Sequence, residues 1–205
     1  MVAVDNLAQQ LIERLKTEEF FRVPASEAEF LDIAPEFPGK LEYHNGEIIA
    51  MSLATALHEL IVFNISRLLA NYFFDKDFLP TSSNAGLQIL RPDGSYYQPD
   101  LMVTQGQWLF KKGSRCIITN PYLLIEVLSK STMKYDKEDK LPAYKDVPSL
   151  QYVVYVGQDR PYVSVYERTA NPDTWLNTDY KTLDSMARLG DLNLPLNEIY
   201  HKITF

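Results

Sequence analysis

A single carboxylate stands inside a strongly apolar segment of the chain. Glu126 lies within residues 122–128, whose other members are Tyr, Leu, Ile and Val. Such a run is typical of a strand covered on both faces. Strand alternation gives Glu126 three companions on one face. These are Tyr122, Leu124 and Leu128. Because an uncompensated buried carboxylate is costly, Glu126 is either an ion-paired strand-end acid or a functional carboxylate with a metal ion, a basic partner or a raised pKa.

A second acid precedes another apolar segment. Asp100 follows Pro99 and leads directly into Leu-Met-Val, so it heads a predicted strand or else caps a loop. Asp93 also follows a proline, but Gly-Ser comes after it, and we predict a surface turn there. If Asp100 and Glu126 lie on neighbouring strands, their oxygens converge on a site for a hard cation, Mg²⁺ or Mn²⁺. Such an ion activates water and stabilises phosphoryl transfer.

Cleavage of a phosphodiester also needs a positive charge near the attacked phosphate. Lys140 is the candidate, because it lies four residues after Asp136 and four before Tyr144, so that the three share one face of a predicted helix. The alternative is that Lys140 is an ordinary solvated lysine on a helix. The type and spacing of these residues favour metal-assisted phosphodiester chemistry without establishing it.

Local signals place the elements that must position these residues. Asn45-Gly46 between apolar arms predicts a hairpin of residues 40–43 and 47–51. Ser26 with Glu29 three residues later predicts a capped helix, and residues 53–72 have helical spacing. A further helix is expected over residues 6–16, and strands over 78–81, 87–90, 100–103, 151–156 and 162–167. Interleaved helices and strands indicate an α/β fold with a mixed sheet and helices on its faces.

Composition narrows the class of protein. The 205 residues have ordinary globular usage and form one expected domain, residues 1–205. One cysteine, Cys116, cannot form an internal disulfide, and a polar N-terminus lacks a signal-peptide core, so a cytoplasmic protein is expected. A net charge of −7 argues against simple electrostatic coating of DNA. Residues 111–145, however, carry eight basic and four acidic groups.

The order and spacing of several segments resemble the Uma2 family, restriction-endonuclease-like proteins of the PD-(D/E)xK nuclease superfamily that are common in cyanobacteria. The resemblance covers residues 25–170. The segments that carry it are Leu41 to Ile49 with Met51 and His58, Gln98 to Val103, Leu124 to Ser129 with Ser131 and Thr132, Asp136, Lys140 to Tyr144, and Val147 to Tyr152.

The resemblance implies a restriction-endonuclease-like mixed sheet with an N-terminal helical and hairpin extension. It also implies that Asp100 and Glu126 bind a metal ion, with the backbone carbonyl of Val127 as a further ligand. Glu47 and His58 would line the same cleft. The family signature ends in Glu-x-Lys, whereas the third position here is Leu128. Lys140 is expected to supply the missing amine.

These residues together predict a Mg²⁺- or Mn²⁺-dependent endonuclease that hydrolyses DNA phosphodiester bonds. By analogy with other enzymes of this fold we expect a homodimer. The alternative is a catalytically inactive nuclease-fold module that binds nucleic acid or a partner protein. The acidic net charge and Leu128 favour that alternative, and the pair of Asp100 and Glu126 favours the enzyme.

Overall fold

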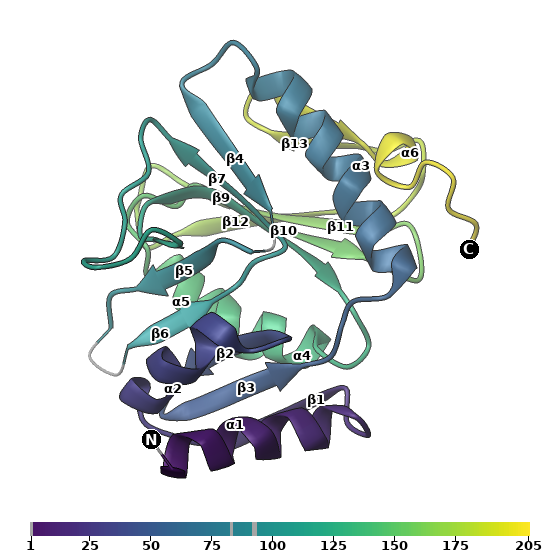
Figure 1. Ribbon diagram of the computed structural model, residues 1–205. Coiled ribbons are helices and arrows are strands. Elements are labelled where there is room, and N and C mark those ends of the chain that lie inside the picture. The colour runs from purple at the N-terminus through teal and green to yellow at the C-terminus, as the bar shows by residue number, and fades with distance from the viewer. Residues whose placement is uncertain (1, 83, 92–93) are drawn as a thin grey trace.

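The computed structural model describes residues 2–82, 84–91 and 94–205, with side chains from residue 6 onward. The expected turn at Asp93 lies outside the described residues. Two six-stranded sheets and a separate two-stranded hairpin make up the β structure (Figure 1). The N-terminal helix lies beside the first sheet, and the C-terminus lies on the other side of the molecule, beyond the C-terminal helix (Figure 1).

The first sheet has the strand order β1-β3-β2-β6-β5-β8. Its strands are β1 (Phe20–Pro24), β2 (Lys40–His44), β3 (Glu47–Met51), β5 (Gly86–Ile89), β6 (Ser95–Tyr97) and β8 (Ile117–Ile118). Neighbours are antiparallel except β5 and β8. The predicted hairpin is confirmed as β2 and β3. Asn45 and Gly46 both have positive φ, 51° and 78°, which a two-residue turn between twisted strands requires.

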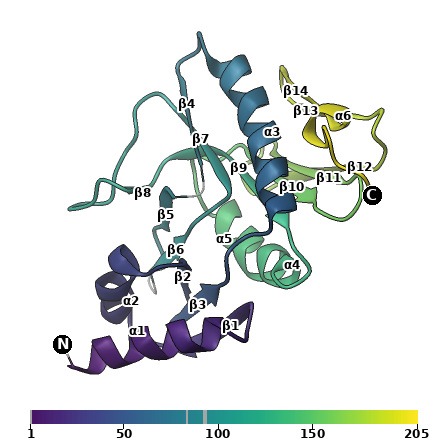
Figure 2. The same ribbon diagram turned by 45° about the vertical axis from the view of Figure 1, so that its right-hand side comes forward.

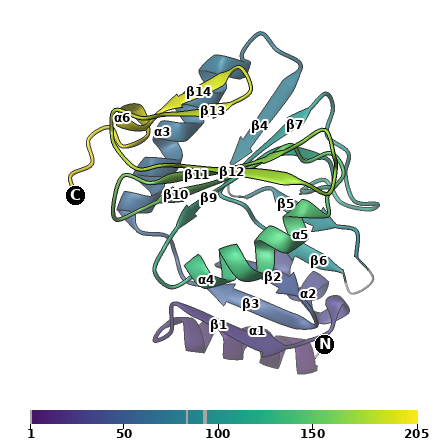
Figure 3. The ribbon, with the colours of Figure 1, turned by 180° about the vertical axis from the view of Figure 1, so that it is seen from behind.

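The second sheet has the order β12-β11-β10-β9-β7-β4. Its strands are β4 (Phe78–Ser82), β7 (Leu101–Gln105), β9 (Pro121–Leu128), β10 (Tyr152–Gly157), β11 (Val163–Arg168) and β12 (Trp175–Tyr180). The central pair, β9 and β10, is parallel, and the other pairs are antiparallel. The separate hairpin, β13 (Met186–Leu189) and β14 (Leu192–Pro195), packs near α3 (Figure 3).

Helices cover both sheets. They are α1 (Val2–Leu15), α2 (Glu27–Ile33), the 3₁₀ turn η1 (Ala34–Glu36), α3 (Ala56–Phe73), α4 (Met133–Tyr135), the π-helical segment η2 (Asp136–Lys140), α5 (Leu141–Lys145) and α6 (Leu196–Ile199). The capping box of Ser26 and Glu29 is confirmed at α2. In the described part of the chain, no helix has the length and apolar character needed to cross a membrane.

The long helix α3 begins three residues later than its spacing predicts. The Thr55 hydroxyl accepts a hydrogen bond from the backbone N–H of His58 at 3.2 Å, which caps the helix at Thr55. Leu53 therefore lies outside the helix and is exposed. This cap also fixes His58 in the first turn of α3, where its side chain points toward the sheet junction.

Side chains of β9 alternate between two hydrophobic cores. Leu123, Ile125 and Val127 pack with α3, α6 and the β13–β14 hairpin. Leu124 and Leu128 pack on the other face, with α5 and residues of the first sheet. This face lies toward the α4–η2–α5 segment, which Figure 3 shows crossing between the sheets. Glu126 shares it with Leu124 and Leu128, as alternation predicts. Tyr122 departs from the alternation and packs with α3's core, next to a register shift at Val103/Thr104.

The chain passes from one sheet to the other between β6 and β7. Only residues 98–100 separate the two strands, so Asp100 lies at the junction of the sheets. The register of β7 and β9 pairs Leu101 with Ile125, which sets Asp100 opposite Glu126. The two acids are therefore brought together on neighbouring strands, as the sequence predicts.

Candidate active site at the sheet junction

Asp100 is buried and held by three donors. Its Oδ2 atom accepts hydrogen bonds from the Val127 backbone N–H at 2.8 Å and lies 3.1 Å from His58 Nε2. Its Oδ1 atom lies 3.2 Å from Lys40 Nζ. Burial alone would raise the pKa of Asp100, but the charge of Lys40 and the contact with His58 outweigh it and hold that pKa well below its usual value. Asp100 therefore stays ionised.

Glu126 is buried in a different environment. Its Oε1 atom accepts hydrogen bonds from the Tyr144 hydroxyl at 2.6 Å and from Lys140 Nζ at 3.1 Å. Its Oε2 atom has only a long contact, 3.4 Å, with the backbone N–H of Asp100. Burial raises the pKa of Glu126 to about 7, against the opposing charge of Lys140 and with the help of the negative charge of Asp100. The Glu126 carboxyl therefore gains and loses a proton near neutral pH. Its Oε2 atom is the less strongly hydrogen-bonded of the two oxygens.

Lys140 is enclosed by acids. Its Nζ lies 3.0 Å from Glu42 Oε1, 3.1 Å from Glu126 Oε1 and 3.0 Å from Asp136 Oδ1, and only 1% of its side chain is exposed. Burial would lower the pKa of Lys140, but the three carboxylates raise it well above its usual value. The shared face of Asp136 and Lys140 is confirmed, and the π-helical geometry of η2 turns both inward. Lys140 is therefore permanently charged and out of contact with solvent.

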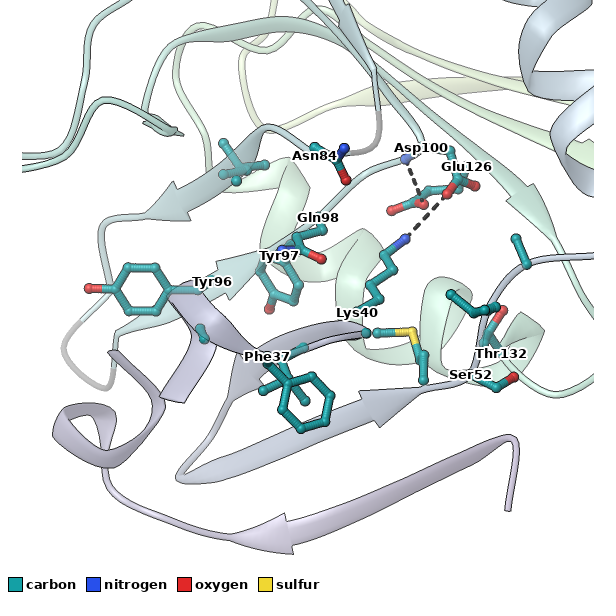
Figure 4. A pocket seen from close by; sticks show the side chains of 18 of the residues that line it. Phe37, Lys40, Ser52, Asn84, Tyr96, Tyr97, Gln98, Asp100, Glu126 and Thr132 are labelled. Carbon is teal, nitrogen blue, oxygen red and sulfur yellow. Dashed lines mark hydrogen bonds and ion pairs between the residues drawn. The ribbon is translucent and has the colours of Figure 1, made fainter. Parts of the chain in front are cut away.

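Lys40 approaches the pair from the other side. It lies at the start of β2, lines the cavity beside Asp100, and 23% of its side chain is exposed. Burial would lower the pKa of Lys40, but the charge of Asp100 outweighs it and raises the pKa. Figure 4 shows the Lys40 side chain pointing toward Asp100 and Glu126. Its amine contacts an acid of the site and is less enclosed than that of Lys140.

The two acids open onto a cavity of about 810 Å³ between the sheets (Figure 4). Polar groups line it next to the acids. They include His58, Asn84, Gln98, Ser129 and Thr132. Burial would lower the pKa of His58, but its hydrogen bond to Asp100 and that acid's charge raise it. A cavity of this volume is large enough for a small organic ligand.

The structure brings most of the predicted residues to this cavity. Asp100, Glu126, Val127, His58 and Lys140 all line it. The structure does not bring Glu47 there.

Glu47 is the first residue of β3, whereas Met51 at the other end of that strand lines the cavity. The Glu47 carboxylate pairs instead with Arg22 at 3.5 Å, and Arg22 also pairs with Asp139 of η2.

Sequence reasoning missed two members of the site, Lys40 and Glu42. Glu42 is fully buried and accepts a hydrogen bond from the Gln98 backbone N–H at 2.8 Å, in addition to its contact with Lys140. A signal was present in the sequence. Lys40 and Glu42 alternate with Leu41 and Tyr43 in a strand next to a strong hairpin turn, but that pattern equally predicts a solvent-facing edge.

The fold is that of restriction-endonuclease-like proteins. A solved structure titled as a putative nuclease belonging to DUF820, from Anabaena variabilis ATCC 29413, matches with a TM-score of 0.68 at 20% identity and covers 86% of this chain and 97% of that chain. At this identity the likeness establishes the fold. Two mixed sheets flanked by helices, with paired carboxylates at their junction, agree with it.

Sequence relatives define the family. The Uma2 family, described as putative restriction endonucleases, matches residues 27–197, and the chain belongs to this family. An uncharacterized protein of Synechocystis sp. PCC 6803, sll1609, is 34% identical over 152 residues, which is 74% of this chain and 85% of the relative. A second one, slr1290, is 30% identical over 168 residues, 81% of this chain and 86% of the relative. The family match extends further toward the C-terminus than the predicted 25–170.

Proposed function

We propose that this protein is a Mg²⁺- or Mn²⁺-dependent endonuclease that hydrolyses DNA phosphodiester bonds at the sheet junction. The observation that carries the proposal is the pair of buried carboxylates, Asp100 and Glu126, on neighbouring strands beside an open cavity. The Uma2 membership and the nuclease-like fold support it.

The donor set fits a magnesium ion that is only partly held by protein. Mg²⁺ usually keeps several waters and binds through one or two carboxylates together with substrate phosphate. The described residues contain no cluster of three or more His, Cys, Asp or Glu side chains that would form a fuller cage. Asp100 and Glu126, with the Val127 carbonyl, would hold the ion. When bound, it supplies an activated water and stabilises charge on the phosphoryl group.

The remaining residues have distinct roles in this proposal. The Glu126 Oε2 atom is the one left to hold the ion, because Lys140 and Tyr144 occupy Oε1 and Oε2 has only a long contact with the Asp100 backbone N–H. Burial and the negative charge of Glu126 raise the pKa of Tyr144 well above its usual value, so its hydroxyl remains a donor that orients Glu126. His58 and the Val127 N–H fix the Asp100 carboxylate. Lys40 is placed to contact an oxygen of the attacked phosphate.

Cleavage of supercoiled plasmid with Mg²⁺, and separately with EDTA, tests the proposal. We expect Asp100→Asn and Glu126→Gln each to abolish cleavage while circular dichroism stays unchanged. Glu13→Gln, on the exposed face of α1, is the matched carboxylate control and should cut at the wild-type rate. Unchanged cleavage by either site variant would refute the assignment.

A thermal melt tests the metal site without any substrate. A divalent ion at tenfold excess over its Kd stabilises the folded state by about 1.4 kcal/mol, which raises Tm by roughly 3–6 °C for a domain of this size. We expect this rise with Mn²⁺ for wild type and a smaller one for Glu126→Gln. No rise in wild type would rule out the two-carboxylate metal site.

One observation favours the second candidate, an inactive nuclease-fold module. Leu128 replaces the lysine of the family signature and is buried in the core, so the amine of that position is lost. Wild type that binds DNA but does not cut with Mg²⁺ or Mn²⁺ would establish this alternative.

A further inference from the structure

A projecting arm borders the cavity. The arm, residues 106–116, connects β7 to β8, and Figure 2 shows it extending away from both sheets. Hydrogen bonds to the residues that follow it fix its conformation. The Lys111 N–H donates to the Ile117 carbonyl at 2.9 Å, and Asn120 Oδ1 accepts from the Leu109 N–H at 2.8 Å. Phe110 forms a bridge with Ile118.

Large apolar side chains on this arm are left in solvent. Trp108 is 40% exposed, Leu109 60% and Phe110 42%. Trp108 and Phe110 are two residues apart in extended chain, so both side chains lie on one side of it. Their ring centroids are 6.1 Å apart. An exposed cluster of this kind marks an interaction site.

The arm is also basic within an acidic protein. It carries Lys111, Lys112 and Arg115, and no acidic residue occurs between Asp100 and Glu126. The chain as a whole has a net charge of −7. A concentration of positive charge beside exposed rings is suited to an anionic partner that also has flat apolar faces.

The turn of the arm borders the same cavity as the acids. Ser114 and Cys116 of the arm, and Ile117 of β8, line it together with Asp100 and Glu126. A chain molecule with one phosphate at the acids would therefore pass close to the turn of the arm. The location connects the arm to the proposed active site rather than to a distant surface.

We propose that the arm binds unpaired nucleotides of the nucleic acid substrate, with bases stacked on Trp108 and Phe110 and phosphates next to Lys111, Lys112 and Arg115. This rests on the proposed function for the identity of the ligand. Single strands are favoured over duplex because base pairing and stacking hide the flat faces of the bases, which unpaired nucleotides expose. The substrate would then be single-stranded DNA, or DNA with an unpaired segment next to the cut.

Fluorescence of Trp108 reports on this interaction directly. The chain has two tryptophans, so Trp175→Phe leaves Trp108 as the single emitter. In EDTA, where no metal-dependent cleavage occurs, we expect a dT oligonucleotide of about fifteen nucleotides to quench this emission and a blunt duplex of equal length to bind more weakly. Trp108→Ala with Phe110→Ala, followed by fluorescence anisotropy of labelled oligonucleotide, should weaken binding at least tenfold.

Salt dependence tests the charged part of the arm. Binding to single strands falls with log salt by roughly 0.7 per phosphate contact, so replacing Lys111, Lys112 and Arg115 by Gln should reduce the slope by about 2. Gln at three lysines outside the arm, Lys16, Lys181 and Lys202, is the control with equal charge loss and should leave the slope nearly unchanged.

Three outcomes would overturn the inference. They are no quenching of Trp108, tighter binding of the duplex, and unchanged affinity in the double Ala variant. If the double variant instead converts a dimer to a monomer in sedimentation without loss of affinity, the arm is a self-association surface. The proposed function can fail independently of this inference. Asp100→Asn should lose cleavage and keep its affinity for the oligonucleotide, so cleavage tests the active site and affinity tests the arm.

Discussion

Two segments bring a lysine to the same pair of carboxylates, and they differ in what surrounds that lysine. The segment η2–α5 encloses Lys140 among Glu42, Glu126 and Asp136 and excludes solvent from it. The start of β2 presents Lys40 to Asp100 alone, at the edge of the cavity. Under the proposed function, this difference separates a lysine that holds an acid in place, Lys140, from a lysine that would contact the substrate, Lys40. Burial distinguishes the two.

The largest effect is expected from the enclosed lysine. Lys140→Met leaves three buried carboxylates facing one another, and removing one partner of a buried ion pair costs roughly 3–5 kcal/mol. Urea unfolding at pH 7 measures this loss. Lowering the pH to 5 should reduce it, because protonation relieves the repulsion.

Lys134→Met, at an exposed lysine of the preceding helix α4, is the control and should change stability by less than about 0.5 kcal/mol. A Lys140→Met protein as stable as wild type would mean that Lys140 does not hold the acids together.

Lys40 should behave in the opposite way. If its amine contacts the attacked phosphate, Lys40→Met should reduce kcat by about a hundredfold or more, comparable to the loss of one preorganised donor. Its effect on Tm should be smaller than that of Lys140→Met, because Asp100 keeps His58 and the Val127 N–H.

Lys40→Arg keeps the charge and should restore part of the rate. Plasmid cleavage under single-turnover conditions measures both variants. A rate loss confined to Lys140→Met would assign the catalytic charge to Lys140 instead.

The sequence predicts Asp100, Glu126 and Lys140 at the cavity, but it misses Lys40 and Glu42 and misplaces Glu47. Asp100 and Glu126 each adjoin an apolar run, which is a local signal for a strand. The Asn-Gly turn and the helical spacing are also local signals, so the β2–β3 hairpin and α3 form close to where the sequence predicts them. Lys40 and Glu42 alternate with apolar residues and look like the exposed face of a strand. Their burial arises only when the first sheet packs against η2–α5, and no local pattern encodes that packing. Glu47 directly follows the Asn45-Gly46 turn, so it lies at the end of β3 opposite Met51, away from the cavity.

A smaller effect should appear in the pH dependence of the metal-free protein. The pKa of Glu126 is about 7, above the value of about 4.3 expected in the unfolded chain. The folded state therefore binds more protons between these values, and the contribution of Glu126 to stability falls as pH rises from about 4.5 to 7.

Glu126→Gln removes this dependence. In EDTA, its free energy of unfolding should fall less than that of wild type between pH 5 and 8. Asp100 does not contribute to the change between pH 5 and 8, because its lowered pKa means that it titrates below pH 5. Parallel curves for the two proteins would show that Glu126 is already ionised at pH 5.

The smallest effect is expected at Glu47, which connects the two lysine segments only indirectly. Arg22 of β1 pairs with Glu47 of the β2–β3 hairpin and with Asp139 of η2, so it joins the two segments behind the site. Both pairs are about one-third exposed, and such pairs contribute about 0–1 kcal/mol. Glu47→Gln should therefore lower the free energy of unfolding by less than about 1 kcal/mol and leave cleavage within twofold of wild type. A hundredfold loss of cleavage with unchanged stability would contradict this and would give Glu47 a direct catalytic role.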